Sequence, residues 1–171
     1  TIDKTRTSTM LDAYGWRHGG GQVNLTGGNA IGQVTTTFTS GGSFLASVTT
    51  YTMLDVVKSK ENASFNVVLA NATLSSSLDI DYSFAVTVNP TNNVPHRLSV
   101  VQSSSSTDGS GHLHIFGTVT NNIGTDATFV QVIATFYTDT SVVAYADWTY
   151  PNPLNLTAGG TGTFEIVALN T

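Results

Sequence analysis

Apolar and polar residues alternate through most of the last third of the chain. Four stretches show this pattern, at residues 112–122, 129–139, 141–150 and 160–169, and Gly, Asn, Asp or Pro residues close them. A period of two between such endings predicts consecutive antiparallel strands with a buried face. In the second stretch Ile133 lies on the face opposite Val132 and Phe136. We therefore expect this strand to be covered on both sides.

The same alternation predicts further strands in the first half of the chain, at residues 30–40, 43–54, 63–74 and 78–89. Ser40-Gly41-Gly42 has the composition of a hairpin connection. Residues 55–61 hold a dense group of charges, and we interpret them as a loop. A strand at 97–103 opens the second half, and the Ser/Gly-rich segment 103–111 is predicted to be a flexible loop.

Two prolines and three asparagines between Asn89 and Pro95 form the clearest boundary in the chain. Proline breaks a strand ladder and stiffens a linker. We therefore predict an N-terminal extended segment at 1–18, a first lobe at 19–91, a linker at 92–95 and a second lobe at 96–171.

The composition supports a folded all-β protein. Hydrophobic residues make up 40% of the chain and charged residues only 10%, and most of the polarity comes from Ser, Thr and Asn. Threonine is β-branched and fits a pleated surface. The net charge of −5 is spread without a basic patch, which argues against a nucleic-acid partner. No apolar run reaches the 18 or so residues needed for a membrane span.

Four N-x-[ST] sequons occur, at Asn24, Asn62, Asn71 and Asn155. In a chain this rich in Asn, Ser and Thr they could be coincidental, or they could mark a secreted glycoprotein that carries N-glycans. Cysteine is absent, which by itself says little about the compartment. If the protein is exported, we expect Thr1 to be a processed or trimmed start.

Residues 1–11 alternate without a turn residue and predict an extended strand. One side of it would carry five residues that are mostly polar: Ile2, Lys4, Arg6, Ser8 and Met10. The segment could be an ordinary first strand. It could also be donated to the open sheet edge of a neighbouring subunit, because main-chain pairing needs little side-chain hydrophobicity. In that case Gly19-Gly20-Gly21 could be the hinge of a projecting arm, and the five residues would form a subunit interface.

Several short motifs in residues 97–169 can be compared with a known family. They are Gly117-Thr-Val-Thr-Asn-Asn, Val132-Ile-Ala-Thr-Phe-Tyr with Asp139, Val142-Val143, and Leu156-x-x-Gly159 before Phe164-x-Ile166. On these motifs the segment resembles the FxLYD β-sandwich domain of archaeal and bacterial surface proteins, with Thr138 inserted before the Asp. The resemblance implies an immunoglobulin-like sandwich on a cell exterior, without catalytic residues. Together with the two lobes predicted above, we expect an all-β chain of two small immunoglobulin-like β-sandwich lobes with an extended N-terminal strand. The whole chain also resembles archaeal thread- or pilus-like subunits that are joined by donor-strand complementation and are often glycosylated.

Few residues suggest chemistry. His112 and His114 have the i, i+2 spacing of metal ligands, with Asp108 nearby, but neither remaining histidine is local. We interpret them as surface histidines. Asp79 and Asp81 share a strand face, and no Gly-x-Ser-x-Gly elbow is present. We therefore expect no catalytic residue, metal or cofactor, and no enzymatic activity.

Two functions fit these observations. The first is a structural subunit of an extracellular filament, a homopolymer that grows head-to-tail when each subunit donates its N-terminal strand to the next. The alternative is a secreted module that binds carbohydrate or protein. Its candidate aromatic surface comprises Trp16, Tyr145, Trp148 and Tyr150.

Overall fold

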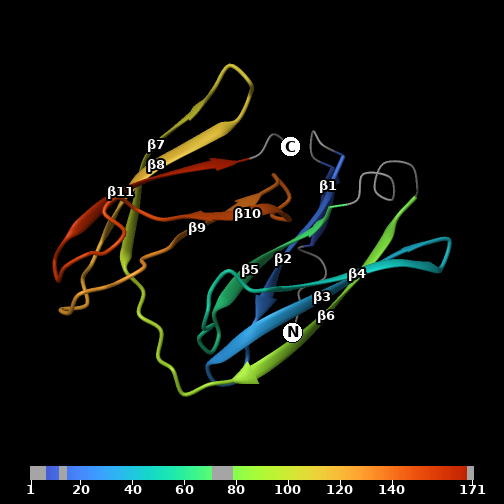
Figure 1. Cartoon of the computed structure of the whole chain (residues 1–171), viewed down its shortest axis with the longest axis horizontal. Helices are drawn as coiled ribbons and strands as arrows, with labels where there is room; N and C mark the ends of the chain where they lie inside the picture. The colour runs from blue at the N-terminus through green and yellow to red at the C-terminus, as the bar shows by residue number, and fades with distance from the viewer. Residues whose placement is uncertain (1–6, 12–14, 71–78, 169–171) are drawn as a thin grey trace. The chain divides into compact units, whose positions relative to one another are not determined.

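A computed structural model describes residues 7–11, 15–70 and 79–168 (Figure 1). The described residues form eleven β-strands and no helix, which confirms the predicted all-β class. Accordingly, no membrane-spanning helix is found in these ranges. The chain divides into two compact units. The first holds the described residues up to Pro95 together with Thr135–Ala146, and the second holds His96–Ala134 and the described residues from Asp147 onward.

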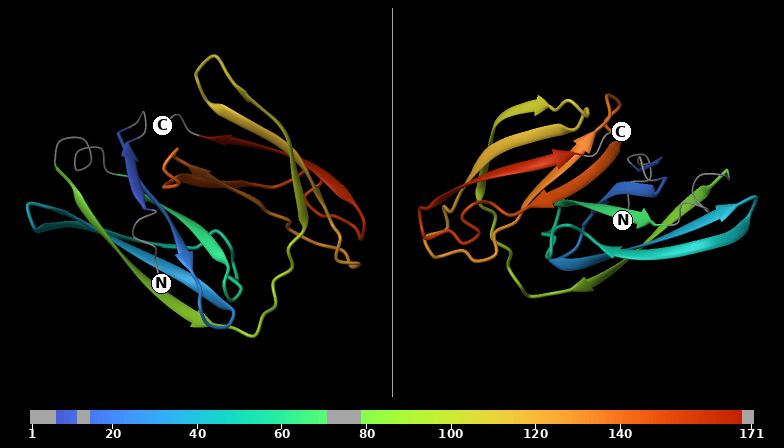
Figure 2. Two further views of the ribbon diagram at one scale, coloured as in Figure 1. Left: turned by 180° about the vertical axis from the view of Figure 1, so that it is seen from behind. Right: turned by 45° about the horizontal axis from the view of Figure 1, so that its top comes forward.

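The first unit contains two three-stranded antiparallel sheets, in the orders β1-β2-β5 and β4-β3-β6 (Figures 1 and 2). Their strands are β1 (Ser8–Leu11), β2 (Arg17–Asn24), β3 (Ala30–Ser40), β4 (Ser43–Tyr51), β5 (Asn62–Leu69) and β6 (Asp81–Pro90). Both sheets contribute to one core. Val23 and Phe65 come from the first sheet, Phe38 comes from the second, and all three are almost completely buried. The Phe84 ring packs edge-on against Phe65 at 5.2 Å. This unit is a β-sandwich.

The predicted connection between β3 and β4 is present. Gly41 and Gly42 both have positive φ, at 54° and 80°. Two such residues form a type I′ turn, whose twist matches that of the flanking strands. Residues 55–61 contain no strand, as predicted. Val57 nevertheless bridges to Ala30 and is buried, so this loop is anchored to the core.

The remaining strands form a three-stranded sheet in the order β11-β8-β7 and the pair β10-β9. They are β7 (Ser99–Thr107), β8 (Leu113–Thr120), β9 (Val132–Tyr137), β10 (Val143–Thr149) and β11 (Thr161–Ala168). The prediction of a loop from residue 103 was wrong, because β7 continues to Thr107. Its last three residues pair with Ile115, His114 and Leu113. Serine and threonine tolerate a strand where a neighbouring strand supplies the hydrogen bonds.

The tip of the β9–β10 hairpin belongs to the first unit, which differs from the predicted continuous lobe at 96–171. Gln22 Nε2 donates to the Tyr137 hydroxyl at 2.6 Å. Ser64 Oγ and Thr135 Oγ1 are also 2.6 Å apart. These bonds cover the face of β2 and β5 that points away from the core. They explain why the strand containing Ile133 has few polar positions, since Ile133–Phe136 are all partly buried.

A buried asparagine holds the loops at one end of the second unit. The Asn121 side chain is 0% exposed, and its Nδ2 donates to the carbonyls of Thr125, Leu156 and Thr157 at 2.7, 2.9 and 3.1 Å. Its Oδ1 accepts from the Ile123 amide at 3.2 Å. The amide is fully used, so burial of this polar group carries no unmet hydrogen bond.

Candidate functional site

The N-terminal strand β1 lies at a sheet edge and pairs with β2 of its own chain. The register places Ser8 opposite Gly20, Thr9 opposite Gly19 and Met10 opposite His18. Of the five predicted interface residues, Ser8 and Met10 are therefore in this pairing and partly buried. The other three lie outside the described residues: Ile2, Lys4 and Arg6.

The three glycines proposed as a hinge lie inside β2, so that prediction was wrong. A Cβ on Gly21 would lie 2.7 Å from the ring of Phe65, and one on Gly20 would lie 3.3 Å from the carbonyl oxygen of Ala144. Glycine is needed at Gly20 and Gly21 because the β10 backbone and the Phe65 ring approach β2 closely there. The predicted boundary at residue 18 also falls within this strand, which begins at Arg17.

The β9–β10 hairpin also contacts β1. Ser8 Oγ donates a hydrogen bond to the Val143 carbonyl, and the Ala144 carbonyl oxygen lies 3.5 Å away. Apart from Met10 and Leu11, the described strand carries only Ser and Thr side chains. Its place is therefore defined by main-chain pairing with β2 and by contact with β10. Such a place can hold an extended chain with little apolar burial.

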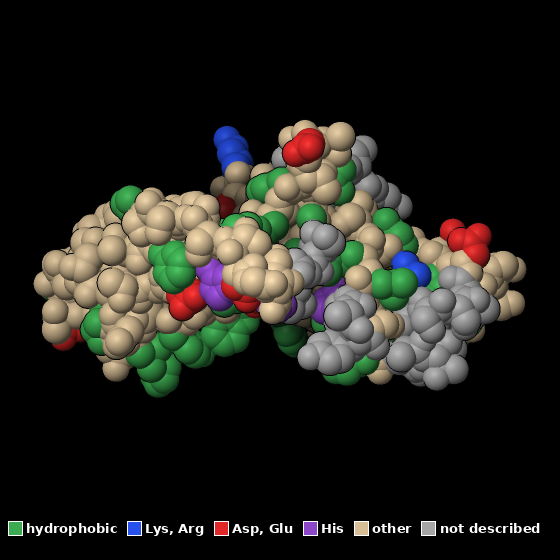
Figure 3. All heavy atoms as spheres, turned by 90° about the horizontal axis from the view of Figure 1, so that it is seen from above, with side chains coloured by type: hydrophobic (Ala, Val, Ile, Leu, Met, Phe, Trp, Pro, Cys, Tyr) green, Lys and Arg blue, Asp and Glu red, His purple; other side chains and the backbone are tan. Residues whose placement is uncertain are grey.

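The second unit contains a cluster of histidine and carboxylate side chains at the β7–β8 turn. Asp108 Oδ2 lies 3.0 Å from His112 Nδ1, and His114 Nδ1 lies 2.6 Å from Glu165 Oε1. His114 Nε2 is 3.5 Å from Asp108 Oδ2, within ion-pair range but without a hydrogen bond. Figure 3 shows histidine and acidic side chains side by side on one face.

Each of these contacts has an electrostatic consequence. The hydrogen bond from His112 is the main cause that holds the pKa of Asp108 well below its usual range. The bond to Glu165 is the main cause that raises the pKa of His114, and Asp108 adds to the effect. No group of three or more His, Asp or Glu side chains among the described residues is arranged to hold a metal ion. The cluster is best described as a set of histidine–carboxylate pairs, one within the β7–β8 turn (Asp108 and His112) and one between β8 and β11 (His114 and Glu165).

Three of the four sequon asparagines are described. Asn24 and Asn62 are cross-strand partners, and Asn24 Nδ2 donates to Asn62 Oδ1 at 2.7 Å. Asn155 is exposed, and its Oδ1 accepts from the Phe129 amide at 2.9 Å. Asn71 lies outside the described residues. The sequence gives no sign that Asn24 and Asn62 are neighbours in space, because they lie 38 residues apart along the chain.

The four candidate aromatic residues are not all exposed. Tyr145 is buried, with its ring edge-on to His18 at 6.0 Å, and Trp16 lies in the first unit. Trp148 and Tyr150 are 42% and 50% exposed, and their rings meet edge-to-face at 4.9 Å. Within the second unit, this pair fits an exposed aromatic contact site.

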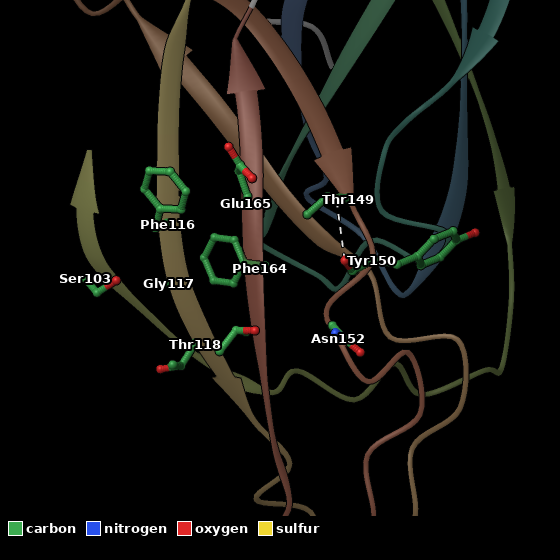
Figure 4. Close-up of a pocket in the computed structure, with 10 residues that line it drawn as sticks. Ser103, Phe116, Gly117, Thr118, Thr149, Tyr150, Asn152, Phe164 and Glu165 are labelled. Atoms are coloured by element: carbon green, nitrogen blue, oxygen red, sulfur yellow. Dashed lines mark hydrogen bonds between the residues drawn. The ribbon is translucent and has the colours of Figure 1, made fainter. Parts of the chain in front are cut away.

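A hollow of about 570 Å³ opens in the second unit (Figure 4). Its lining comprises Ser103, Phe116, Gly117, Thr118, Thr149, Tyr150, Asn152, Thr163, Phe164 and Glu165. The Tyr150 ring points away from the other labelled side chains (Figure 4). Glu165 is the single carboxylate in the lining and already contacts His114. The hollow thus lacks the pair of carboxylates that glycoside hydrolysis uses. Asp79 and Asp81 are both exposed.

Comparison with known proteins gives little. No family model and no curated protein matches the chain, so the resemblances to FxLYD domains and to archaeal thread subunits stay predictions. Among solved structures, a calcium-binding mutant of Bacteroides uniformis β-glucuronidase 2 matches with 18% identity and a TM-score of 0.28. The match covers 98% of this chain but only 23% of that one. A likeness this weak carries no argument about function.

Proposed function

We propose that the chain is a structural subunit of an extracellular filament that grows head-to-tail by exchange of the N-terminal strand. In the filament, β1 of one subunit would take the place on the next subunit that β1 here occupies on its own β2. The supporting observation is that β1 is a short edge strand held by main-chain pairing. Such an element can pair with an identical copy through the same contacts, which is the basis of domain swapping.

The length of β2 adds to this argument. β2 pairs with β5 from Arg17 to Asn24, whereas its described pairing with β1 stops at Gly20. In the exchanged arrangement, the same register continued along β2 would set Arg6 opposite Gln22 and Lys4 opposite Asn24. In that register a donated segment of eleven residues would reach along the whole of β2, with Leu11 opposite Arg17 and Lys4 opposite Asn24.

The setting is part of the same proposal. An extracellular, cell-surface location fits the low charge and the hydroxyl-rich composition. N-glycans at Asn24, Asn62, Asn71 and Asn155 would fit that location. Head-to-tail contact between non-equivalent surfaces generates an open filament where the rotation does not close a ring.

Deletion of residues 1–11 tests the proposal. Negative-stain microscopy should show filaments of the full chain and only separate particles of the shortened chain. A synthetic peptide of residues 1–11 should bind the shortened chain in a one-to-one ratio, whereas a scrambled peptide should not. Filaments that persist after the deletion would sink the proposal.

The exposed pair Trp148 and Tyr150 favours a second candidate function. Exposed Trp and Tyr rings stack on sugar rings and anchor protein partners. In this alternative the chain is a secreted binding module, and the isolated monomer should bind on a glycan array. The double variant W148A/Y150A should lose the signal, because the aromatic surface is removed, whereas Trp16→Ala should keep it.

A further inference from the structure

The most open strand edge in the described residues is β7. It is the outer strand of the β11-β8-β7 sheet, and all nine of its residues are exposed (Figure 1). Val100 is 52% exposed and Val101 62% exposed, although they point to opposite faces of the sheet. A strand in this position presents unpaired N–H and C=O groups along its length, and these groups can pair with another strand.

Proteins usually protect such edges with charges, proline or bulges. β7 contains no charged residue and no proline. By comparison, edge strand β6 begins at Asp81 and ends at Pro90. The outer edge of β11 is partly occupied, because Asn152 and Thr163 exchange two main-chain hydrogen bonds.

The one protective feature of β7 is a bulge at its centre. The pairing with β8 shifts between Gln102 and Ser104, so Ser103 is the extra residue. It separates two arms of four residues each, Ser99–Gln102 and Ser104–Thr107. An antiparallel copy of the same strand would bring each arm against the other arm, with Ser103 near the centre.

The charges at the two ends of β7 favour the same arrangement. Arg97 precedes the strand and Asp108 follows it directly. Asp108 stays ionised at neutral pH because hydrogen bonds from His112 and Ser110 hold its pKa low. Two antiparallel copies place Arg97 of one beside Asp108 of the other, whereas parallel copies would place like charges together. Opposite-charge pairs stabilise an interface and fix its register.

We propose that β7 is a docking edge for the β7 strand of a second copy of this chain, paired antiparallel about a twofold axis near Ser103. The two three-stranded sheets would then join into one sheet of six strands. The contact is closed, because each copy uses its own β7. If the proposed function holds, this contact joins neighbouring filaments side by side rather than lengthening them.

A cysteine scan tests the contact, since the natural chain has no cysteine. Single substitutions Ser99→Cys, Ser103→Cys, Ser104→Cys and Thr107→Cys are made in the full chain and oxidised in air. Disulfide-linked dimers should form in highest yield at 103 or 104 and fall toward 99 and 107, because only central residues lie opposite themselves. The control is Thr161→Cys, at an exposed position of β11. Equal yields at every position, or no dimer at 103 and 104, would overturn the proposal.

A second pair of variants needs no cross-link. Val101→Lys puts a charge on the β7 edge of each copy, and sedimentation should show at least a tenfold weaker dimer with an unchanged melting temperature. Val167→Lys, at a 40% exposed position of β11, should leave the dimer intact. Microscopy then separates the two proposals: Val101→Lys should abolish lateral association and keep any filaments. Loss of the filaments themselves would show that β7 is not a lateral contact.

Discussion

The two edge strands β1 and β7 differ in length and burial but share a design. β1 has four residues, is mostly half-buried and lies against β2 and β10. β7 has nine residues, and every one is exposed. β1 has as many hydroxyl as apolar side chains, and in β7 the hydroxyl side chains outnumber the apolar ones, so main-chain hydrogen bonds would carry any pairing. The comparison teaches that β1 already covers the edge of β2 within its own chain, whereas no strand of the described residues pairs with the outer edge of β7.

The strands that pair with β1 and β7 are also alike, because each has a glycine paired with a phenylalanine of the next strand. In the first unit, Gly21 of β2 pairs with Phe65 of β5, and β1 lies on the other side of β2. In the second unit, Gly117 of β8 pairs with Phe164 of β11, and β7 lies on the other side of β8. A Cβ on Gly117 would collide with the Phe164 ring and the Val101 carbonyl. In both cases the phenylalanine ring fills the space that a side chain at the glycine would occupy, and so replaces the packing that glycine cannot provide.

The largest loss of stability is expected at Asn121, which holds the loops at one end of the second unit. Asn121→Ala removes four hydrogen bonds from a buried side chain and leaves three carbonyls without that donor. It should lower the free energy of unfolding by about 3 kcal/mol. Denaturant titration measures this. The neighbouring Asn122→Ala removes one exposed bond to Ser99 and should cost less than about 1 kcal/mol. Equal effects of the two would contradict the account.

The next largest loss of stability is expected at Gly21 of β2, the strand that pairs with β1. Gly21→Ala places a methyl group 2.7 Å from the buried Phe65 ring and 2.8 Å from Thr7 Cγ2. It should destabilise the protein by about 2 kcal/mol through overpacking. Gly19→Ala meets nothing closer than 3.6 Å and should be neutral or stabilising by about 0.5 kcal/mol. Thermal unfolding of both variants measures the two effects separately. Gly21→Ala reports the steric clash, and Gly19→Ala reports the general cost of having glycine in a strand.

A smaller loss of stability is expected at Ser8, the side chain that bonds β1 to β10. Ser8→Ala removes the donor to the Val143 carbonyl and should cost about 1 kcal/mol. Thr9→Ala removes only a long 3.4 Å bond from Arg17 and should cost less. Hydrogen exchange at the amides of β1 should accelerate in Ser8→Ala and change little in Thr9→Ala. The reverse order would mean that the hairpin does not hold the strand.

The smallest effect concerns pH at the end of β7. Because the folded pKa of His114 is raised above 6.5, its protonated form stabilises the fold below about pH 6.5. That stabilisation is lost as the pH rises through the folded pKa. NMR titration should give a His114 pKa above 6.5, and a lower one in Glu165→Gln. An unchanged value in that variant would contradict the assigned partner.

Local alternation was enough to predict the all-β class and most strands, since strands such as β3 and β11 alternate between buried and more exposed positions. It failed for the second half of β7, because Ser103–Thr107 have no hydrophobic period and become a strand only beside β8. It also failed for the glycines of β2, because the need for glycine at Gly20 and Gly21 comes from Ala144 and Phe65, both distant in sequence. The contacts of Tyr137 with Gln22 and of Thr135 with Ser64 depend on tertiary packing that a local pattern does not encode.

One measurement tests the exchange of β1 most directly. Thr9 and Gly19 are directly paired, and a Cβ on Gly19 would lie 4.0 Å from Thr9 Cγ2, so cysteines at both positions can form a disulfide. The double variant T9C/G19C is oxidised under conditions in which filaments assemble and is then denatured without reductant. Strand exchange predicts a ladder of covalent multimers on the gel. A single band of internally cross-linked monomer would contradict it.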